Sequence, residues 1–124
     1  YLHFTLYIIH CTKMKNITVL VSGSGSNLQR IIDCIDNGEI PNAKVNLVVA
    51  DRDCYALERA KNHNIPFQLI KRGKEFSENL DKILPENTDL IVLAGFLSIL
   101  KSDFCEKYKV SAAIWRNVRK LVIA

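Results

Sequence analysis

The sequence predicts an α/β fold in which a parallel β-sheet carries helices on both faces. Over residues 14–95, apolar segments alternate with segments whose apolar residues recur at helical spacing, as repeated strand–helix–strand units require. The strand segments are apolar without alternation, which is typical of strands buried on both faces. A glycine turn at residues 22–25 joins the first strand to the first helix. Crossover connections of this kind are right-handed and join parallel strands.

The first strand and its turn are expected to form the ligand-facing start of the sheet. Residues 18–21 are β-branched or apolar and predict a buried strand. Gly23 and Gly25 allow a sharp turn and a close approach of the backbone to a ligand. Ser26 is expected to be the N-cap of the following helix, and Gln29 would complete a capping box.

The first helix is expected over residues 27–37. Gly38 would end it, and Pro41 would prevent it from resuming. Its apolar residues fall at i, i+3, i+4 and i+7 and so share one face. These residues are Leu28, Ile31, Ile32 and Ile35.

The later elements follow the same pattern. The second helix would bury Leu57 and Ala60 and end at Asn64 in the left-handed conformation. Ser77 and Ser102 are expected to cap the third helix and a short final helix. The remaining expected elements are strands at 44–50, 67–70 and 89–94, and helices at 55–63, from 77 onward, and at 103–108.

Two loops have the chemistry of a binding site. In parallel sheets, ligands lie beyond the carboxyl ends of the strands, where the strand order reverses. Residues 22–27 lead into a helix, whose free N–H groups and dipole favour an anion such as phosphate. Residues 96–100 are too apolar for an ordinary exposed loop, and either fold onto the core or form an apolar wall for a ring-bearing ligand.

Other interpretations of the glycine turn remain open at this point. The glycines could be needed only for the backbone conformation of a strand–helix turn, without any ligand. The pattern also resembles a dinucleotide-binding motif, but Leu28 stands where that motif has its third glycine. Asp51 could hold a ribose hydroxyl, although it lies late in the chain for that role. The turn is not a phosphate-binding P-loop, because no Gly-Lys-Ser/Thr follows it.

Three motifs in the same order resemble phosphoribosylglycinamide formyltransferases. VLVSGSGSNLQ at 19–29, with 31–33, is similar to the start of these enzymes. ALERA at 56–60 with NIP at 64–66 resembles their second helix and third strand, and DLIVLAGFLSIL at 89–100 resembles their fourth strand and folate loop. The resemblance implies a Rossmann-like formyltransferase fold, here truncated. It also implies transfer of a formyl group from 10-formyltetrahydrofolate to glycinamide ribonucleotide in purine (IMP) biosynthesis.

The resemblance also implies roles for particular residues. Gly25, Ser26 and Asn27 would hold the phosphoribosyl end of glycinamide ribonucleotide. The pteridine pocket would be lined, through backbone groups and apolar contact, by Leu97, Ser98, Ile99 and Leu100. Many members of the family have arginine at the position of Ser98.

The catalytic motif of the family is not found in this sequence. The family carries asparagine-x-histidine-proline-serine on its fifth strand and a later aspartate, whereas Asn117 has no histidine two residues on. Formyl transfer passes through an oxyanion and needs such donors. We therefore assign no catalytic residue and expect this polypeptide alone not to catalyse transfer. His63 is expected to be a solvated surface residue.

Composition narrows the class of protein. The net charge is +4, but residues 14–109 contain as many basic as acidic residues, so a nucleic-acid-binding face is not indicated. The four cysteines show no Cys-x-x-Cys spacing and favour neither a metal site nor a disulfide framework. Residues 1–9 are apolar but lack the basic flank of a signal peptide, and no run is long enough to span a membrane. The expectation is a cytoplasmic protein without a metal cofactor.

The chain is expected to have three parts. Residues 1–13 would be a non-native leader, residues 14–109 the N-terminal part of a formyltransferase domain, and residues 110–124 a divergent tail from a frameshift or fragment end. An uncovered sheet edge would then favour self-association, although the oligomeric state stays open. The alternatives to the enzyme are a non-catalytic module that binds a nucleotide or sugar phosphate, and a degenerate product without a ligand.

Overall fold

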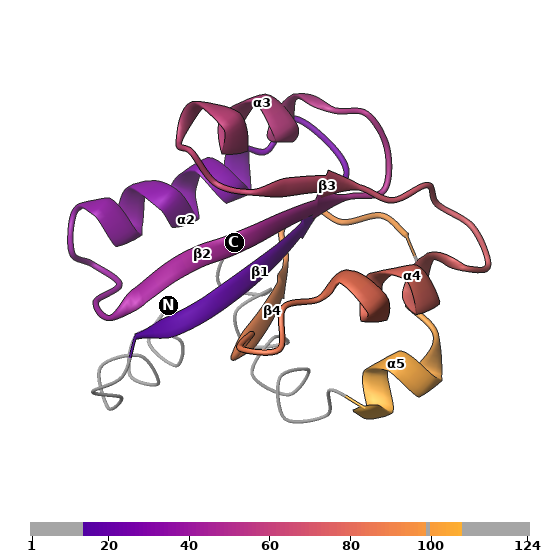
Figure 1. The fold of residues 1–124 in the computed structure, drawn as a ribbon. Helices are drawn as coiled ribbons and strands as arrows, with labels where there is room; N and C mark the ends of the chain where they lie inside the picture. The colour runs from indigo at the N-terminus through magenta and orange to yellow at the C-terminus, as the bar shows by residue number, and fades with distance from the viewer. Residues whose placement is uncertain (1–13, 99, 108–124) are drawn as a thin grey trace.

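The computed structural model describes residues 14–98 and 100–107 and shows a parallel sheet between two layers of helices (Figure 1). The four strands of the described part are hydrogen-bonded in the order β3-β2-β1-β4, and all pairs are parallel. The elements are β1 (Lys15–Val21), α2 (Ser26–Asp36), β2 (Ala43–Ala50), α3 (Tyr55–Asn62), β3 (Phe67–Leu69), α4 (Phe76–Ile83), β4 (Leu90–Leu93) and α5 (Ser102–Lys107). The predicted α/β fold is confirmed.

Strand β1 lies at the centre of this arrangement and separates the two halves of the core. Ile17, Val19 and Val21 pack into the cluster that contains the buried residues of α2 and α3. Leu20 packs into the other cluster, with Phe76 of α4 and Phe104 of α5. Because successive side chains of a strand point to opposite faces, β1 is buried on both faces from Ile17 to Val21.

The direction in which strands are added to the sheet reverses between β1 and β4. The chain runs from β1 outward to β2 and β3, and then returns to add β4 on the other side of β1. Figure 1 shows the carboxyl ends of these strands at one edge, where the chain turns into α2 and into the segment before α5. This is the place at which parallel α/β proteins bind ligands.

The start of α2 differs from the prediction. The helix begins at Ser26, and Gly25 is its N-cap, with a left-handed φ of 79° and no capping side chain. The Gln29 amide nitrogen donates to the Gly25 carbonyl oxygen at 2.8 Å. The predicted capping box of Ser26 and Gln29 is therefore wrong, because the left-handed turn at Gly25 starts the helix one residue earlier.

The start of α4 also differs, for a packing reason. The helix begins at Phe76, which is buried, and its ring centroid lies 5.4 Å from that of Phe96. Ser77 is therefore inside the helix, and its hydroxyl oxygen accepts a hydrogen bond from the Lys101 amide at 2.9 Å instead of capping. Ser102, predicted as a cap, is the first residue of α5.

The second helix and third strand follow the prediction with small differences. Asn64 has a φ of 57°, as expected for a left-handed stop. Ala60 is buried as predicted, but the second fully buried residue is Ala56, and Leu57 is only half-buried. Strand β3 has three residues, all exposed, because it forms the outer edge of the sheet in the described part.

Candidate functional site

The two loops that the sequence singled out lie side by side. Since β1 and β4 are neighbours in the sheet, the segments that follow them leave it at the same edge. The Leu97 amide donates to the Ser22 hydroxyl oxygen at 2.9 Å, which joins the segment after β4 directly to the glycine loop. The segment around Leu97 and the glycine loop therefore form one continuous surface at the reversal point of the sheet.

The glycine loop places the start of α2 close to α3. A Cβ atom on Gly25 would lie 2.8 Å from the Cα of Ala56, so only glycine fits there without movement of the backbone. Gly23, Ser24 and Ser26 are exposed, and Asn27 is half-buried. The first amides of the helix have no partner within it, and their dipoles sum toward this open end. This geometry suits an anion such as phosphate.

Arg59 adds a positive charge beside this loop, a role that the sequence alone does not indicate. From α3, its Nε donates to the Ser24 carbonyl oxygen at 2.7 Å, and its guanidinium also reaches Gln29 at 3.4 Å. The guanidinium carbon lies 4.9 Å from the ring centroid of Tyr55. These contacts hold a cation next to the helix start, where it strengthens attraction for an anion. Only the packing of α3 against α2 reveals this position.

Asp51 is buried at the centre of the same edge, directly after β2. Its carboxylate accepts hydrogen bonds from Arg52, at 2.9 and 3.1 Å, and from the Ser98 hydroxyl. Burial raises the pKa of Asp51, but hydrogen bonds from Arg52, Ser98 and Ser22, together with the charge of Arg52, outweigh burial and hold the pKa below its usual range. The carboxylate is therefore occupied within the chain, which disfavours the role of ribose ligand in a dinucleotide site.

The segment after β4 in part folds onto the core and in part leaves an apolar side chain exposed, so both alternatives expected from the sequence apply. Phe96 is buried and Leu100 is half-buried, and both pack against the core around α4. Leu97 instead has 69% of its surface exposed and offers an apolar contact at the edge of the site. Ser98 is half-buried against Asp51. Ile99 lies outside the described residues, as do residues 108 and 109, the predicted leader at 1–13 and the predicted tail at 110–124.

His63 is exposed at the end of α3, as predicted for a surface histidine. Its Nε2 lies 3.2 Å from the side-chain amide nitrogen of Gln29, in the first turn of α2. Within residues 14–98 and 100–107, no group of three or more His, Cys, Asp or Glu side chains is placed to hold a metal ion. In the same part of the chain, no helix has the length and apolarity needed to cross a bilayer.

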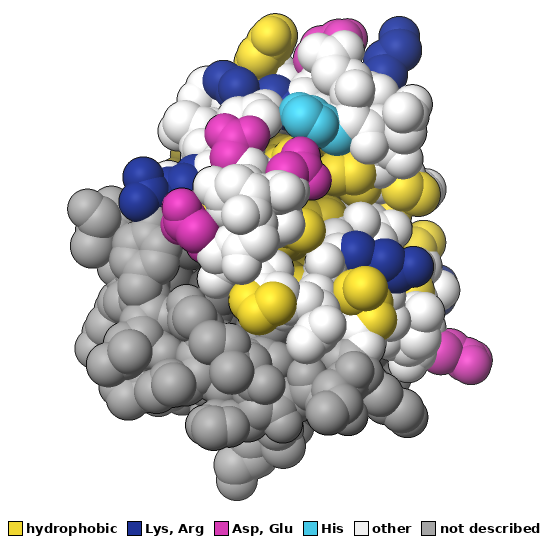
Figure 2. Space-filling model, turned by 90° about the vertical axis from the view of Figure 1, so that its left-hand side faces the viewer, with side chains coloured by type: hydrophobic (Ala, Val, Ile, Leu, Met, Phe, Trp, Pro, Cys, Tyr) yellow, Lys and Arg dark blue, Asp and Glu magenta, His cyan; other side chains and the backbone are white. Residues whose placement is uncertain are grey.

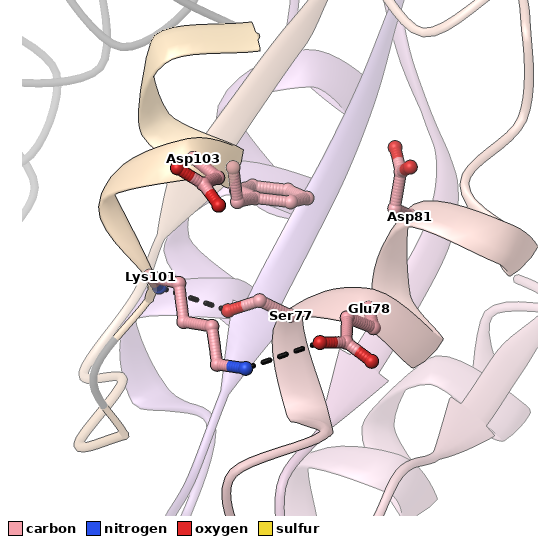
Figure 3. Close-up of a pocket in the computed structure, with 6 residues that line it drawn as sticks. Ser77, Glu78, Asp81, Lys101 and Asp103 are labelled. Atoms are coloured by element: carbon pink, nitrogen blue, oxygen red, sulfur yellow. Dashed lines mark hydrogen bonds and ion pairs between the residues drawn. The ribbon is translucent and has the colours of Figure 1, made fainter.

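Two further hollows lie outside the loops. One, of about 180 Å³, is lined by α4 and the start of α5 and includes an ion pair between Lys101 and Glu78 at 3.1 Å (Figure 3). The other, of about 390 Å³, lies among α2, β2 and the end of α3 and is lined by Ile32, Val45 and Ile65 among others. Figure 2 shows apolar side chains in a depression between charged ones on one side of the molecule. Neither hollow includes a predicted site residue.

The fold and the paired loops define an α/β protein in which two candidate binding loops meet at the carboxyl ends of a parallel sheet. The model of the formyl transferase family matches residues 15–114, so the chain belongs to this family.

Sequence relatives carry more specific names. The chain is 44% identical over 103 residues to a phosphoribosylglycinamide formyltransferase of Haemophilus influenzae, covering 77% of this chain and 48% of the relative. It is 35% identical over 105 residues to the human trifunctional purine biosynthetic protein adenosine-3, covering 77% of this chain and 10% of that protein. The chain thus spans about half the length of the single-function relative.

Solved structures agree with this placement. Glycinamide ribonucleotide transformylase 1 of Geobacillus kaustophilus matches with a TM-score of 0.70 and 31% identity, over 79% of this chain and 55% of that one. A formyltetrahydrofolate deformylase of Pseudomonas putida matches with a TM-score of 0.68 at 17% identity, which shows a shared fold alone. The resemblance expected from the sequence motifs is therefore confirmed.

Proposed function

We propose that this chain carries the substrate-binding N-terminal part of a phosphoribosylglycinamide formyltransferase of purine biosynthesis. The reaction is transfer of a formyl group from 10-formyltetrahydrofolate to glycinamide ribonucleotide, in the cytoplasm and without a metal. Relatives and solved structures of this name support the proposal. Since the chain spans about half of these proteins, the complete reaction is proposed for a protein of their full length.

The observation that carries the proposal is the junction of the two loops. Gly25 opens α2 in the left-handed conformation, and the Leu97 amide bonds to Ser22 three residues before it. One ligand bound at the helix start and another bound against Leu97 would therefore meet above the reversal point of the sheet. Formyl transfer needs this proximity, because it joins two substrates in one reaction.

The phosphate end of glycinamide ribonucleotide is assigned to the start of α2. Gly25, Ser26 and Asn27 supply backbone amides and short polar side chains there, and the guanidinium of Arg59 supplies a neighbouring positive charge. Phosphate carries two negative charges near neutral pH, so both features favour it.

The folate cosubstrate is assigned to the segment after β4. Leu97 offers exposed apolar surface for a pterin ring, while Ser98, Ile99 and Leu100 continue the chain at the same edge. Apolar walls with a few fixed polar groups are typical of pockets for ring-bearing ligands. The described residues contain no histidine at either loop, so the proton-transfer step is not assigned to them.

Isothermal titration calorimetry tests this function against the alternative of a general nucleotide or sugar-phosphate module. Glycinamide ribonucleotide is expected to bind to the 124-residue protein in preference to NAD and to free nucleotides. Equal binding of NAD would favour the general module, and the internal pairing of Asp51 argues against that result. If none of these ligands binds, both the proposed function and the general-module alternative are contradicted.

A further inference from the structure

Asp51 is the one charged side chain that is buried among the described residues, with 1% of its surface exposed. A buried carboxylate is unfavourable unless charges or hydrogen bonds compensate it. Its carboxylate accepts hydrogen bonds from the adjacent Arg52 and from Ser98 after β4, and Ser22 after β1 also helps to lower its pKa. The carboxylate therefore lies where the ends of three neighbouring strands meet.

The network fixes two consecutive residues of the folate-side segment. The Ser98 hydroxyl donates directly to the Asp51 carboxylate. The Leu97 amide donates to the Ser22 oxygen at 2.9 Å, and the Ser22 side chain lies near enough to Asp51 to help lower the pKa of its carboxyl group. Asp51 thus holds Ser98 directly, and Leu97 is held between Ser98 and its own hydrogen bond to Ser22.

The backbone of Asp51 is anchored as well. Its amide donates to the Val21 carbonyl oxygen at 3.3 Å, and its own carbonyl oxygen accepts from the Arg72 amide at 3.3 Å. The position of Asp51 relative to the sheet is therefore fixed, so its carboxylate can hold a loop in place. Hydrogen bonds that support binding residues in this way keep them in position before the ligand binds.

We propose that Asp51 is a positioning residue, which holds Leu97 and Ser98 against the glycine loop and so sets the separation of the two substrate sites. This inference rests on the proposed function, because it assigns folate to the segment after β4. No substrate contact is assigned to Asp51 itself. Its effect passes through Ser98, which is bonded to it and adjoins Leu97.

Amide hydrogen exchange, followed by NMR without ligand, tests the positioning itself. In D51N, exchange protection of the Leu97 amide is expected to fall about tenfold, the size of one lost charge-assisted hydrogen bond. The Ala94 amide, bonded to the Leu20 carbonyl oxygen at 2.9 Å, is expected to keep its protection. The matched control is D53N, the same change at an exposed residue two positions on.

S98A is the second variant, since it removes a single hydroxyl and leaves Asp51 paired with Arg52. It is expected to lower Leu97 protection about threefold. Unchanged Leu97 protection in S98A or in folded D51N would overturn the proposal. An equal loss at Ala94 would also overturn it, because the effect would then be global.

Ligand binding separates this inference from the proposed function. In D51N, the dissociation constant for tetrahydrofolate is expected to rise about tenfold, and that for glycinamide ribonucleotide to change by less than about twofold. An equal rise for both ligands would overturn the assignment of Asp51 to the folate side. If the wild-type protein binds neither ligand, the proposed function fails, while the exchange experiment still decides whether Asp51 holds the segment.

Discussion

Gly25→Ala is expected to be the most damaging small substitution in the glycine loop. Two separate penalties apply. The left-handed φ of 79° is unfavourable for alanine by about 1–2 kcal/mol. The new Cβ would also lie 2.8 Å from both the Cα and Cβ of Ala56 and 3.0 Å from the Cδ of Arg59, and overpacking of this kind destabilises by about 1–3 kcal/mol. The free energy of unfolding is therefore expected to fall by about 2–5 kcal/mol.

Two other glycines provide matched controls for the two penalties. Gly38 has a φ of 85°, but an added Cβ would meet nothing within 4 Å, so Gly38→Ala should lose only the ~1–2 kcal/mol of backbone strain. Gly23 has neither a positive φ nor a close neighbour, so Gly23→Ala should leave stability within about 1 kcal/mol of wild type. The three variants therefore separate strain from packing.

Urea denaturation followed by circular dichroism measures these differences as shifts in the transition midpoint. Gly23→Ala is expected to be the most stable of the three variants, Gly38→Ala the next and Gly25→Ala the least stable. Equal losses for Gly25→Ala and Gly38→Ala would refute the argument, because the contact with Ala56 would then contribute nothing.

Three further predictions concern binding, pH and catalysis. Arg59→Gln is expected to weaken the binding of glycinamide ribonucleotide about fivefold and to reduce its salt dependence. Lys61→Gln, an exposed change on the same helix, is the control, and equal effects of both would contradict the role of Arg59. Because the pKa of Asp51 lies below its unfolded value, its stabilising contribution should be present above about pH 4 and be lost as the pH falls through the lower folded value. Urea midpoints measured between about pH 2 and 7 should therefore fall more steeply below about pH 4 in wild type than in D51N. Identical profiles for the two proteins would contradict this prediction. Finally, the 124-residue polypeptide should bind glycinamide ribonucleotide without formylating it, since the described loops contain no histidine, and detection of the formylated product by mass spectrometry would contradict the prediction.

Much of the fold followed from local patterns, because strands buried on both faces and amphipathic helices leave clear signals. The apolar run around Leu20 and the helical spacing from Leu28 to Ile35 placed the elements to within a few residues. The starts of α2 and α4 could not be predicted, because packing decides them. Gly25 meets Ala56, and Phe76 enters the core beside Phe96.

The candidate site was predictable only in part. The two loops were located from their composition, and their contact followed from the neighbouring places of β1 and β4. The roles of Arg59 and Asp51 required the tertiary structure. Nothing local distinguishes Arg59 from other surface arginines, and the partners of Asp51 at Ser22 and Ser98 are distant in sequence. Whether Gly25, Ser26 and Asn27 bind phosphate stays a prediction.

The short edge strand β3 has a consequence for the solution behaviour of the protein. It pairs only with Val48–Ala50, so the preceding residues of β2 have no partner from β3 in the described part of the chain. Unpaired strand edges can recruit a strand from another molecule. Lys44 is exposed at this position, and a charged side chain there opposes such recruitment. Lys44 is therefore expected to disfavour pairing of this border with a strand of another molecule.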